Sequence, residues 1–87
     1  MGSVKPVTVY GNANCAFCGA ARMLLTKKGI PFEDVNVAAD PVTFAEMSQR
    51  SGSRTVPQIF IGEAPIGGFD ELYALDKSGE LDKMLAD

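Results

Sequence analysis

Cys15 and Cys18 are the residues of this sequence best suited to chemistry, because only two residues separate them. The sequence has no histidine, so imidazole cannot activate either cysteine as a nucleophile. Two cysteines are also too few for the usual zinc sites, and we expect no bound metal. At this spacing the two sulfur atoms can form a disulfide when the second cysteine lies in the first turn of a helix. The pair therefore predicts reversible thiol–disulfide chemistry.

The cysteine pair stands between a predicted strand, residues 6–10, and a predicted helix, residues 15–28. Apolar residues recur at helical spacing in this helix, and we expect Asn14 as its N-cap and Gly29 just after its end. Cys15 would then face the unpaired N–H groups and the positive dipole of the helix N-terminus, which favour thiolate over thiol. The alternative is that both cysteines are small core residues. We favour the redox interpretation because the pair opens a helix directly after a strand.

Two further segments could bind a ligand. In Thr55-Val56-Pro57, the proline marks either an ordinary strand start or a cis peptide bond. A cis bond would leave the backbone of Val56 free to pair with an extended peptide. In Gly67-Gly68-Phe69-Asp70, the glycines let the backbone approach a ligand, and a helix N-terminus supplies N–H groups beside a carboxylate. The alternative for this second segment is a glycine turn with Asp70 as a helix N-cap.

The remaining patterns predict a single α/β domain over residues 1–87. Short apolar runs alternate with helical periodicity in the order β-α-β-α-β-β-α-α, which builds a four-stranded mixed sheet flanked by helices. The second helix begins at Asp40-Pro41, a capping residue followed by a residue suited to the first helical position, and it ends at Gly52. The other predicted elements are strands at 31–37, 58–61 and 64–66, a hairpin connection at 62–63, and two helices that follow Gly68 and Gly79.

The charge balance and the hydropathy pattern argue against several classes of partner. Eight basic residues stand against eleven acidic ones, for a net charge of −3 without a basic patch, so we expect no nucleic acid partner. No stretch has the apolar length of a membrane span, and we expect no membrane partner. The first residues lack the apolar core of a secretion signal. We therefore expect a cytoplasmic protein.

Three motifs, taken in order, resemble the glutaredoxin family, whose members have the thioredoxin fold. They are Cys15-Ala16-Phe17-Cys18, Arg54-Thr55-Val56-Pro57-Gln58 and Ile66-Gly67-Gly68-Phe69-Asp70. The resemblance extends from Val7 to Leu85, and it separates the sequence from thioredoxins, which lack the Gly-Gly-x-Asp turn. It implies a monomeric enzyme that uses glutathione as a co-substrate to reduce protein disulfides and protein–glutathione mixed disulfides.

The resemblance also implies a role for each motif. Cys15 would be the nucleophile that forms a mixed disulfide with glutathione, and Cys18 would be the resolving thiol, needed for dithiol reduction alone. Val56 would pair its backbone with the cysteinyl residue of glutathione, and Asp70 would meet the ammonium group of the γ-glutamyl end. The residues implied to bind glutathione are Phe17, Thr55, Val56, Pro57, Gly68, Phe69 and Asp70.

Two positions near the implied glutathione site depart from the family pattern. Asn12 stands where many members have a lysine, and Phe44 stands where a polar or basic residue is common. Both of those family residues meet a carboxylate of glutathione. We therefore expect glutathione binding that is weaker and less dependent on charge.

A third departure is Ala16, which stands where the commonest active site has proline. Members without that proline sometimes bridge a [2Fe-2S] cluster between two subunits through glutathione and the first cysteine, here Cys15. Such a cluster-binding dimer is one alternative function. An electron donor served by thioredoxin reductase is a second, and a non-redox interaction domain is a third.

Overall fold

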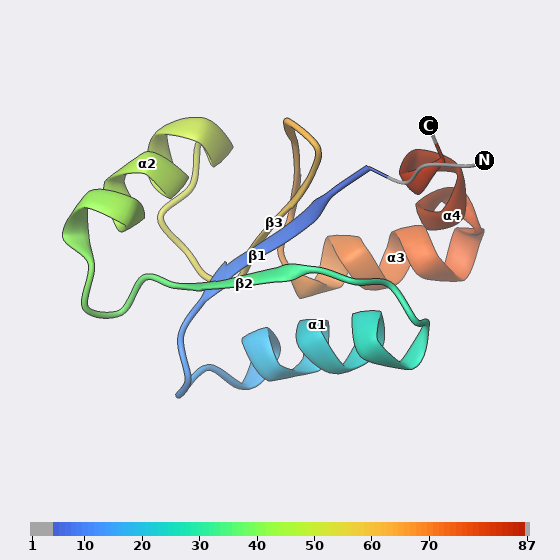
Figure 1. Cartoon of the computed structure of the whole chain (residues 1–87), viewed down its shortest axis with the longest axis horizontal. Helices are drawn as coiled ribbons and strands as arrows, with labels where there is room; N and C mark the ends of the chain where they lie inside the picture. Colours follow the sequence, from blue (N-terminus) through green and yellow to red (C-terminus); the bar gives the residue numbers. More distant parts are fainter. Residues whose placement is uncertain (1–4, 87) are drawn as a thin grey trace.

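The computed structural model describes residues 5–86 and contains a four-stranded mixed sheet with helices on both faces (Figure 1). The elements follow the predicted order β-α-β-α-β-β-α-α. No helix among the described residues is long and apolar enough to cross a membrane. The strands are β1 (Val7–Gly11), β2 (Glu33–Asn36), β3 (Gln58–Ile61) and β4 (Ala64–Gly67). The helices are α1 (Ala16–Lys27), α2 (Pro41–Ser51), α3 (Phe69–Ser78) and α4 (Glu80–Leu85).

The strand order β2-β1-β3-β4 puts β1 in the middle of the sheet. β1 runs parallel to β2 and antiparallel to β3, with Tyr10 opposite Gln58. The end of β1 therefore lies beside the beginning of β3. The loop that carries Cys15 and the segment that ends at Pro57 meet at this edge, although they lie far apart in the sequence.

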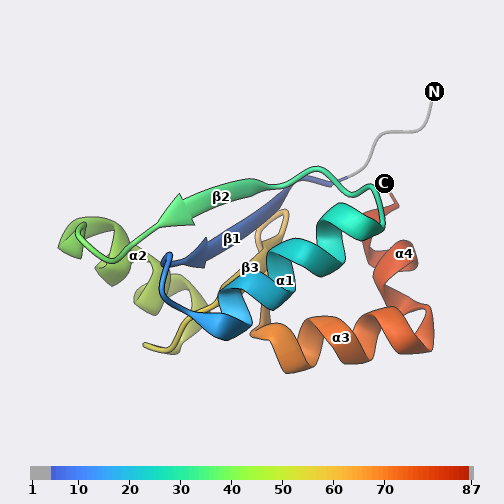
Figure 2. The same cartoon turned by 90° about the horizontal axis from the view of Figure 1, so that it is seen from below.

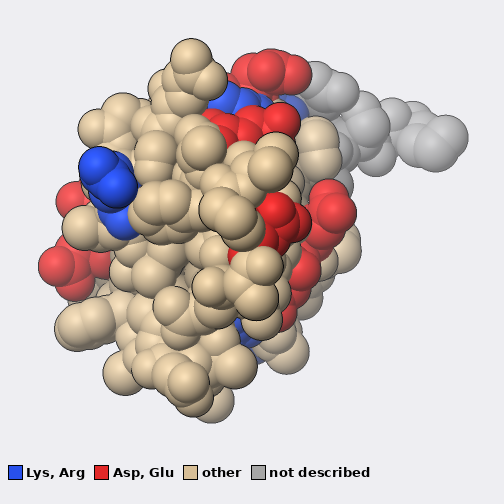
Figure 3. Space-filling view, turned by 90° about the vertical axis from the view of Figure 1, so that its left-hand side faces the viewer, with Lys and Arg blue, Asp and Glu red and all other residues tan. Residues whose placement is uncertain are grey.

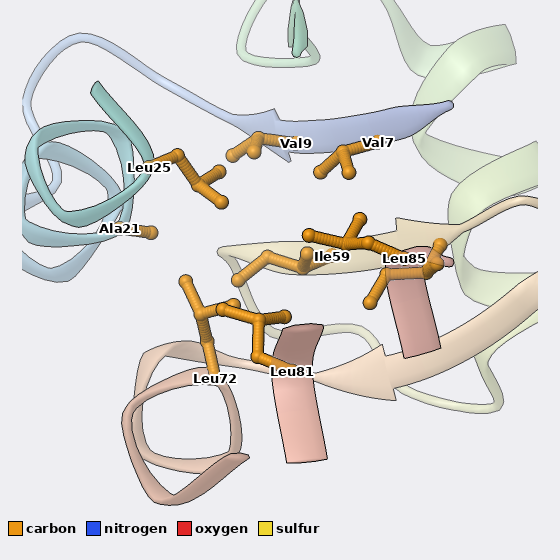
Figure 4. Packing of buried hydrophobic residues seen from close by; sticks show 9 residues of the cluster. Val7, Val9, Ala21, Leu25, Ile59, Leu72, Leu81 and Leu85 are labelled. Carbon is orange, nitrogen blue, oxygen red and sulfur yellow. The ribbon is translucent and has the colours of Figure 1, made fainter. Parts of the chain in front are cut away.

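Two hydrophobic clusters cover the two faces of the sheet. Strand alternation divides β3 between them, because Ile59 and Ile61 point to one face and Phe60 to the other. α1, α3 and α4 cover the first face, where Figure 4 shows the larger cluster, and α2 packs on the second face. The larger cluster contains Val7, Val9, Ala21, Leu25, Ile59, Ile61, Leu72, Leu81 and Leu85. The smaller one contains Tyr10, Val37, Met47 and Phe60.

The ends of α2 lie where the sequence predicts them. Asp40 is the N-cap, and its carboxylate accepts the N–H of Thr43 at 3.1 Å. Pro41 occupies the first turn, where its missing N–H costs no hydrogen bond. Gly52 ends the helix in the left-handed conformation, with φ of 76°, which glycine adopts without steric cost. These signals act over a few residues, so the sequence alone reveals them.

The prediction that Asn14 caps α1 is wrong, because Cys15 is the N-cap. The Oδ1 atom of Asn12 accepts the N–H of Asn14 at 3.0 Å. This local turn holds Asn14 outside the helix. α1 consequently begins at Ala16, one residue later than predicted.

The second strand is shorter than its predicted range of residues 31–37. β2 pairs with β1 from Glu33, opposite Thr8, to Asn36, opposite Gly11. β1 ends at Gly11, so a longer strand would find no partner beyond that point. At the other end, Pro31 has no N–H to donate to a ladder.

Candidate functional site

Cys15 lies at the N-terminal end of α1, where its sulfur takes the place of a capping oxygen. Its backbone is extended, with φ of −104° and ψ of 117°. The Sγ atom accepts the N–H of Cys18 at 3.1 Å and lies 3.9 Å from the carbonyl oxygen of Val56. The side chain is half-buried. The loop before α1 and the segment before β3 therefore meet at an accessible sulfur atom.

Cys18 lies in the first turn of α1, as predicted, and its side chain is fully buried. The pKa of Cys18 is raised to about 11, mainly by burial and in addition by a hydrogen bond with the Cys15 side chain. Both cysteines are free thiols. The two sulfur atoms thus have different environments. The sulfur of Cys15 is accessible to a reagent, whereas the sulfur of Cys18 is buried and protonated at neutral pH.

Gly11 makes room for Cys18, a role that the sequence analysis missed. A Cβ atom at this position would lie 2.6 Å from the Sγ atom of Cys18 and 3.1 Å from its Cβ atom. Both separations are below ordinary van der Waals contact. The end of β1 therefore has to be glycine for α1 to pack this closely.

Arg22 is a second residue that the sequence analysis missed. It lies one helical turn after Cys18, and its Nη2 atom donates to the carbonyl oxygen of Asn12 at 3.2 Å. Its Nε atom lies 3.0 Å from a carboxylate oxygen of Asp34 on β2. The positive charge lowers the pKa of Cys18, opposing the larger effect of burial. The spacing of four residues from Cys18 was the available signal.

The segment before β3 is held in place by Gln58. The peptide bond between Val56 and Pro57 is cis, which was one of the two predicted possibilities. Gln58 is buried, and its Nε2 atom donates to the carbonyl oxygen of Thr55 at 2.9 Å and to the hydroxyl oxygen of Thr55 at 3.1 Å. Among residues 5–86, the backbone of Val56 makes no backbone hydrogen bond outside regular elements, so it remains available to an extended ligand.

The N-terminus of α3 faces the same segment. Its N-cap is Gly68, so the alternative that Asp70 caps the helix is wrong. The N–H of Gly68 donates to the carboxylate of Glu71 at 2.8 Å. The first N–H groups of a helix have no partner within the helix, and the exposed Asp70 carboxylate lies in this same turn. Backbone donors and a carboxylate are thus presented side by side.

These segments enclose a groove of about 420 Å³. Figure 3 views the end of the molecule that carries α2 and the loop before α1, and most of this face is uncharged. Ser51, Ser53, Gln58, Gly67 and Glu71 complete the lining. All the residues implied to bind glutathione line this groove: Phe17, Thr55, Val56, Pro57, Gly68, Phe69 and Asp70.

A second hollow of about 480 Å³ lies on the other side of Val56. Asn12 and Phe44, the two positions that depart from the family pattern, both line it. Its other lining residues are Val37, Ala38, Ala39 and Pro41, so none of the lining side chains is charged. This hollow offers a carboxylate no cationic partner among its lining residues.

The described part of the chain contains no group of three or more His, Cys, Asp or Glu side chains that could hold a metal ion. Cys15 is the accessible sulfur ligand that one chain could offer to a cluster. A cluster bridged between two chains through Cys15 stays a prediction.

Comparison with known proteins gives the family. The family model described as Glutaredoxin matches residues 7–66. A glutaredoxin of Pseudomonas aeruginosa is 43% identical over 83 residues, which cover 95% of this chain and 99% of that protein.

Two solved structures extend the comparison to the fold. The solution structure of a glutaredoxin from Brucella melitensis has a TM-score of 0.84 at 45% identity, covering 97% of this chain and 91% of that one. The crystal structure of a buckwheat glutaredoxin–glutathione complex has a TM-score of 0.85 at 28% identity, covering 93% of this chain and 76% of that one. The chain has the same thioredoxin fold, and it belongs to the glutaredoxin family of thiol oxidoreductases.

Proposed function

We propose that this chain is a glutathione-dependent oxidoreductase that reduces protein–glutathione mixed disulfides and protein disulfides. Cys15 is the nucleophile and Cys18 the resolving thiol. The main observation in support of the proposal is that the two sulfur atoms differ in exposure to solvent. Cys15 is reachable beside a groove, whereas Cys18 is buried directly behind it with a pKa of about 11.

In the monothiol reaction, the Cys15 thiolate attacks the glutathione sulfur of a mixed disulfide. The bond between the protein sulfur and the glutathione sulfur breaks, and the protein thiolate leaves and takes up a proton. A second glutathione thiolate then attacks the glutathione sulfur bound to Cys15, which forms glutathione disulfide and releases the Cys15 thiolate. The net reaction converts one mixed disulfide and one glutathione thiol into one protein thiol and one glutathione disulfide, and Cys15 is regenerated.

In the dithiol reaction, Cys15 attacks a protein disulfide and forms a mixed disulfide with one of its sulfur atoms. Cys18 loses its proton and attacks the sulfur of Cys15, which releases the reduced protein and closes a Cys15–Cys18 disulfide. The positions of the two residues at the N-cap and in the first helical turn suit the geometry of a disulfide. Two glutathione molecules then reduce this disulfide.

The groove can hold glutathione as an extended peptide. The backbone of Val56, which makes no backbone hydrogen bond among the described residues, suits pairing with the cysteinyl residue. At the N-terminus of α3, unpaired N–H groups suit the γ-glutamyl carboxylate, and Asp70 suits its ammonium group. The glycine end would lie in the uncharged hollow beside Asn12 and Phe44, so its carboxylate adds little affinity. The glutathione complex of the structurally similar buckwheat protein supports this choice of ligand.

We propose that the chain acts as a monomer, as its resemblance to the family implies. We place the reaction in the cytoplasm, where glutathione keeps thiols reduced. The partners are glutathione and proteins that carry disulfides or glutathionylated cysteines. No metal takes part in either reaction.

Turnover of a glutathionylated peptide by glutathione, coupled to NADPH and glutathione reductase, tests the proposal. We expect Cys15→Ser to reduce turnover by at least about a hundredfold, because the variant lacks the attacking thiolate. We expect Cys18→Ser to keep turnover within about threefold of the wild type, because the monothiol reaction does not use Cys18. The same Cys18→Ser variant should lose reduction of an intramolecular protein disulfide.

The two variants serve as controls for each other, since each removes one sulfur atom from the same helical turn. Equal loss in both would contradict the assigned roles. A wild-type protein that turns over with thioredoxin reductase but not with glutathione would reject glutathione dependence and favour the electron-donor alternative.

A further inference from the structure

Exposed apolar side chains gather on one side of the molecule. Four large hydrophobic side chains are exposed among the described residues, and Phe17, Met23 and Tyr73 belong to α1 and α3. Their exposed fractions are 60%, 64% and 47%. The fourth, Val42, lies on α2. α1 and α3 run side by side on the same face of the sheet (Figure 2), so three of the four exposed apolar side chains share one surface.

An aromatic series leads from the site along this surface. The ring of Phe17 stacks on that of Phe69, with centroids 6.1 Å apart, and Phe69 lies 5.9 Å from Tyr73. The ammonium group of Lys77 lies 5.7 Å from the ring of Tyr73. The series therefore begins at Phe17, one of the two residues between the cysteines, and ends at the ammonium group of Lys77 on α3.

A groove of about 310 Å³ lies beside this series, and we call it the α1–α3 groove. Its apolar lining residues are Ala20, Met23, Leu24, Phe69 and Tyr73. Phe69 also lines the groove proposed for glutathione. The two grooves thus share the ring of Phe69 as a lining residue.

Lysines form the rim of the α1–α3 groove, in a chain whose net charge is −3. Lys27 and Lys28 line it, and Lys77 lies beside Tyr73. Lys28 is paired with Asp76 at 2.6 Å, so its charge is largely compensated. Lys27 and Lys77 leave a positive rim around an apolar floor. An occupant with both apolar and acidic side chains fits this combination.

We propose that the α1–α3 groove binds the polypeptide of the protein substrate, as an extended segment with an apolar side chain next to an acidic one. This inference rests on the proposed function. When glutathione fills the first groove, the polypeptide is the other partner joined to the reacting sulfur. Phe17 follows Cys15 by two positions and is exposed, so the aromatic series that begins there offers the polypeptide a surface beside the reacting sulfur. No other exposed large apolar surface among the described residues starts at the cysteine pair.

The geometry sets the position of the apolar side chain. Met23 follows Cys15 by eight positions along α1, a distance of about 12 Å at roughly 1.5 Å per helical residue. An extended peptide covers this distance with about four residues. We therefore expect the groove to bind an aromatic or large aliphatic residue about four positions from the reactive cysteine.

Kinetics with two matched peptides and a small substrate test the inference. The first peptide has a central glutathionylated cysteine, phenylalanine about four residues away on each side and glutamate next to each phenylalanine. The second has serine in place of phenylalanine. The small substrate is the mixed disulfide of glutathione and cysteamine, which cannot reach the α1–α3 groove.

We expect the double variant Met23→Ser/Tyr73→Ser to lower kcat/KM for the phenylalanine peptide by about fivefold to tenfold, mainly through KM. Activity on the serine peptide and on the small substrate should not change, because neither fills the groove. Both substituted side chains are exposed, so the fold should be kept. Val42→Ser is the matched control, since it removes an exposed apolar side chain from α2, and it should leave all three activities unchanged.

A double variant that keeps the full wild-type preference for the phenylalanine peptide over the serine peptide would overturn the inference. So would a concentration-dependent dimer of the wild type that the double variant abolishes, because a second copy of the chain would then occupy the groove. Sedimentation of the wild type and the variant distinguishes this case.

A binding measurement separates this inference from the proposed function. The phenylalanine peptide with serine in place of cysteine cannot react, yet it should shift NMR signals of residues 20–28 and 69–77 in the wild type. Shifts without any turnover of the small substrate would reject the glutathione reaction and keep the docking surface. Turnover without these shifts would reject the docking surface alone.

Discussion

A side chain at position 11 would occupy the space in which Cys18 lies. The Cβ atom of an alanine there would approach the Sγ atom of Cys18 to 2.6 Å, so α1 or the cysteine has to move. We expect Gly11→Ala to lower the free energy of unfolding by about 1–3 kcal/mol, the usual cost of overpacking. It should also slow closure of the Cys15–Cys18 disulfide and spare turnover of a glutathionylated peptide, which needs Cys15 alone. Urea unfolding and the two redox assays measure these effects.

Gly19→Ala is the matched control for this prediction, because a Cβ atom at Gly19 meets nothing within 4 Å. It replaces glycine inside α1, so it should stabilise the protein by about 0.5–1 kcal/mol. In a Cys18→Ala background, Gly11→Ala should cost less, since the clashing sulfur is gone. An unchanged cost in that background would mean that position 11 acts on something other than Cys18.

At the level of single residues, the sequence predicts what depends on near neighbours. The redox pair and the groove residues are recognisable because they form short motifs, and the structure places these residues around one groove. Gln58 and Arg22 were not predicted as positioning residues. Gln58 is buried because β3 is an inner strand, and Arg22 is held by Asp34 on β2. Both roles depend on elements that come together only in the folded sheet.

The start of α1 is suited to a proline that the sequence lacks. Ala16 is the first residue of the helix and is exposed, and the backbone of Cys15 before it is extended at φ −104° and ψ 117°. A residue before proline prefers this conformation, and proline itself is favoured at the first helical position. We expect Ala16→Pro to raise the free energy of unfolding by about 0.4–1 kcal/mol, by restricting the unfolded chain. Urea unfolding measures this change.

Ala20→Pro is the control within the same helix. Proline at this interior position removes a helical hydrogen bond and clashes with the preceding turn, so it should destabilise the protein by about 3 kcal/mol or more. Destabilisation by Ala16→Pro as well would show that the turn before α1 is not free to accept the ring.

At the level of elements, the order and type of every helix and strand were predicted correctly, and the errors are at their ends. α2 begins and ends as predicted because Asp40, Pro41 and Gly52 act locally. The start of α1 was misplaced by one residue because Asn12, rather than the helix, binds the N–H of Asn14. β2 was predicted too long because its length is set by β1, its partner in the sheet. The length of a strand thus depends on contacts with a segment distant in the sequence.

The stability of the whole molecule should depend on pH in the alkaline range through Cys18. Its pKa is raised from 9.0 to about 11, mainly by burial, so the folded state keeps a proton that the unfolded chain has already lost. The stabilising contribution is present below the unfolded pKa and is lost as pH rises towards the folded pKa. We expect urea unfolding under reducing conditions to show a steeper loss of stability in the wild type than in Cys18→Ala between about pH 9 and pH 11.

All other side chains are the same in the two proteins, so the difference between the two slopes isolates Cys18. Cys18→Ala replaces a small buried side chain with a smaller one and should keep the fold, which circular dichroism can confirm. Parallel pH profiles would mean that Cys18 gains access to solvent in the native state.

The larger hydrophobic cluster joins residues from nearly the full length of the described chain. Val7 and Val9 on β1 belong to the same cluster as Leu81 and Leu85 on α4. A ribosome synthesises β1 early and α4 late. The cluster cannot close until α4 has emerged. Cys15 and Cys18 leave the ribosome long before that moment, so the nascent chain exposes both thiols while its protective core is incomplete. During synthesis, the buried cysteine is therefore as open to oxidants as the reactive one.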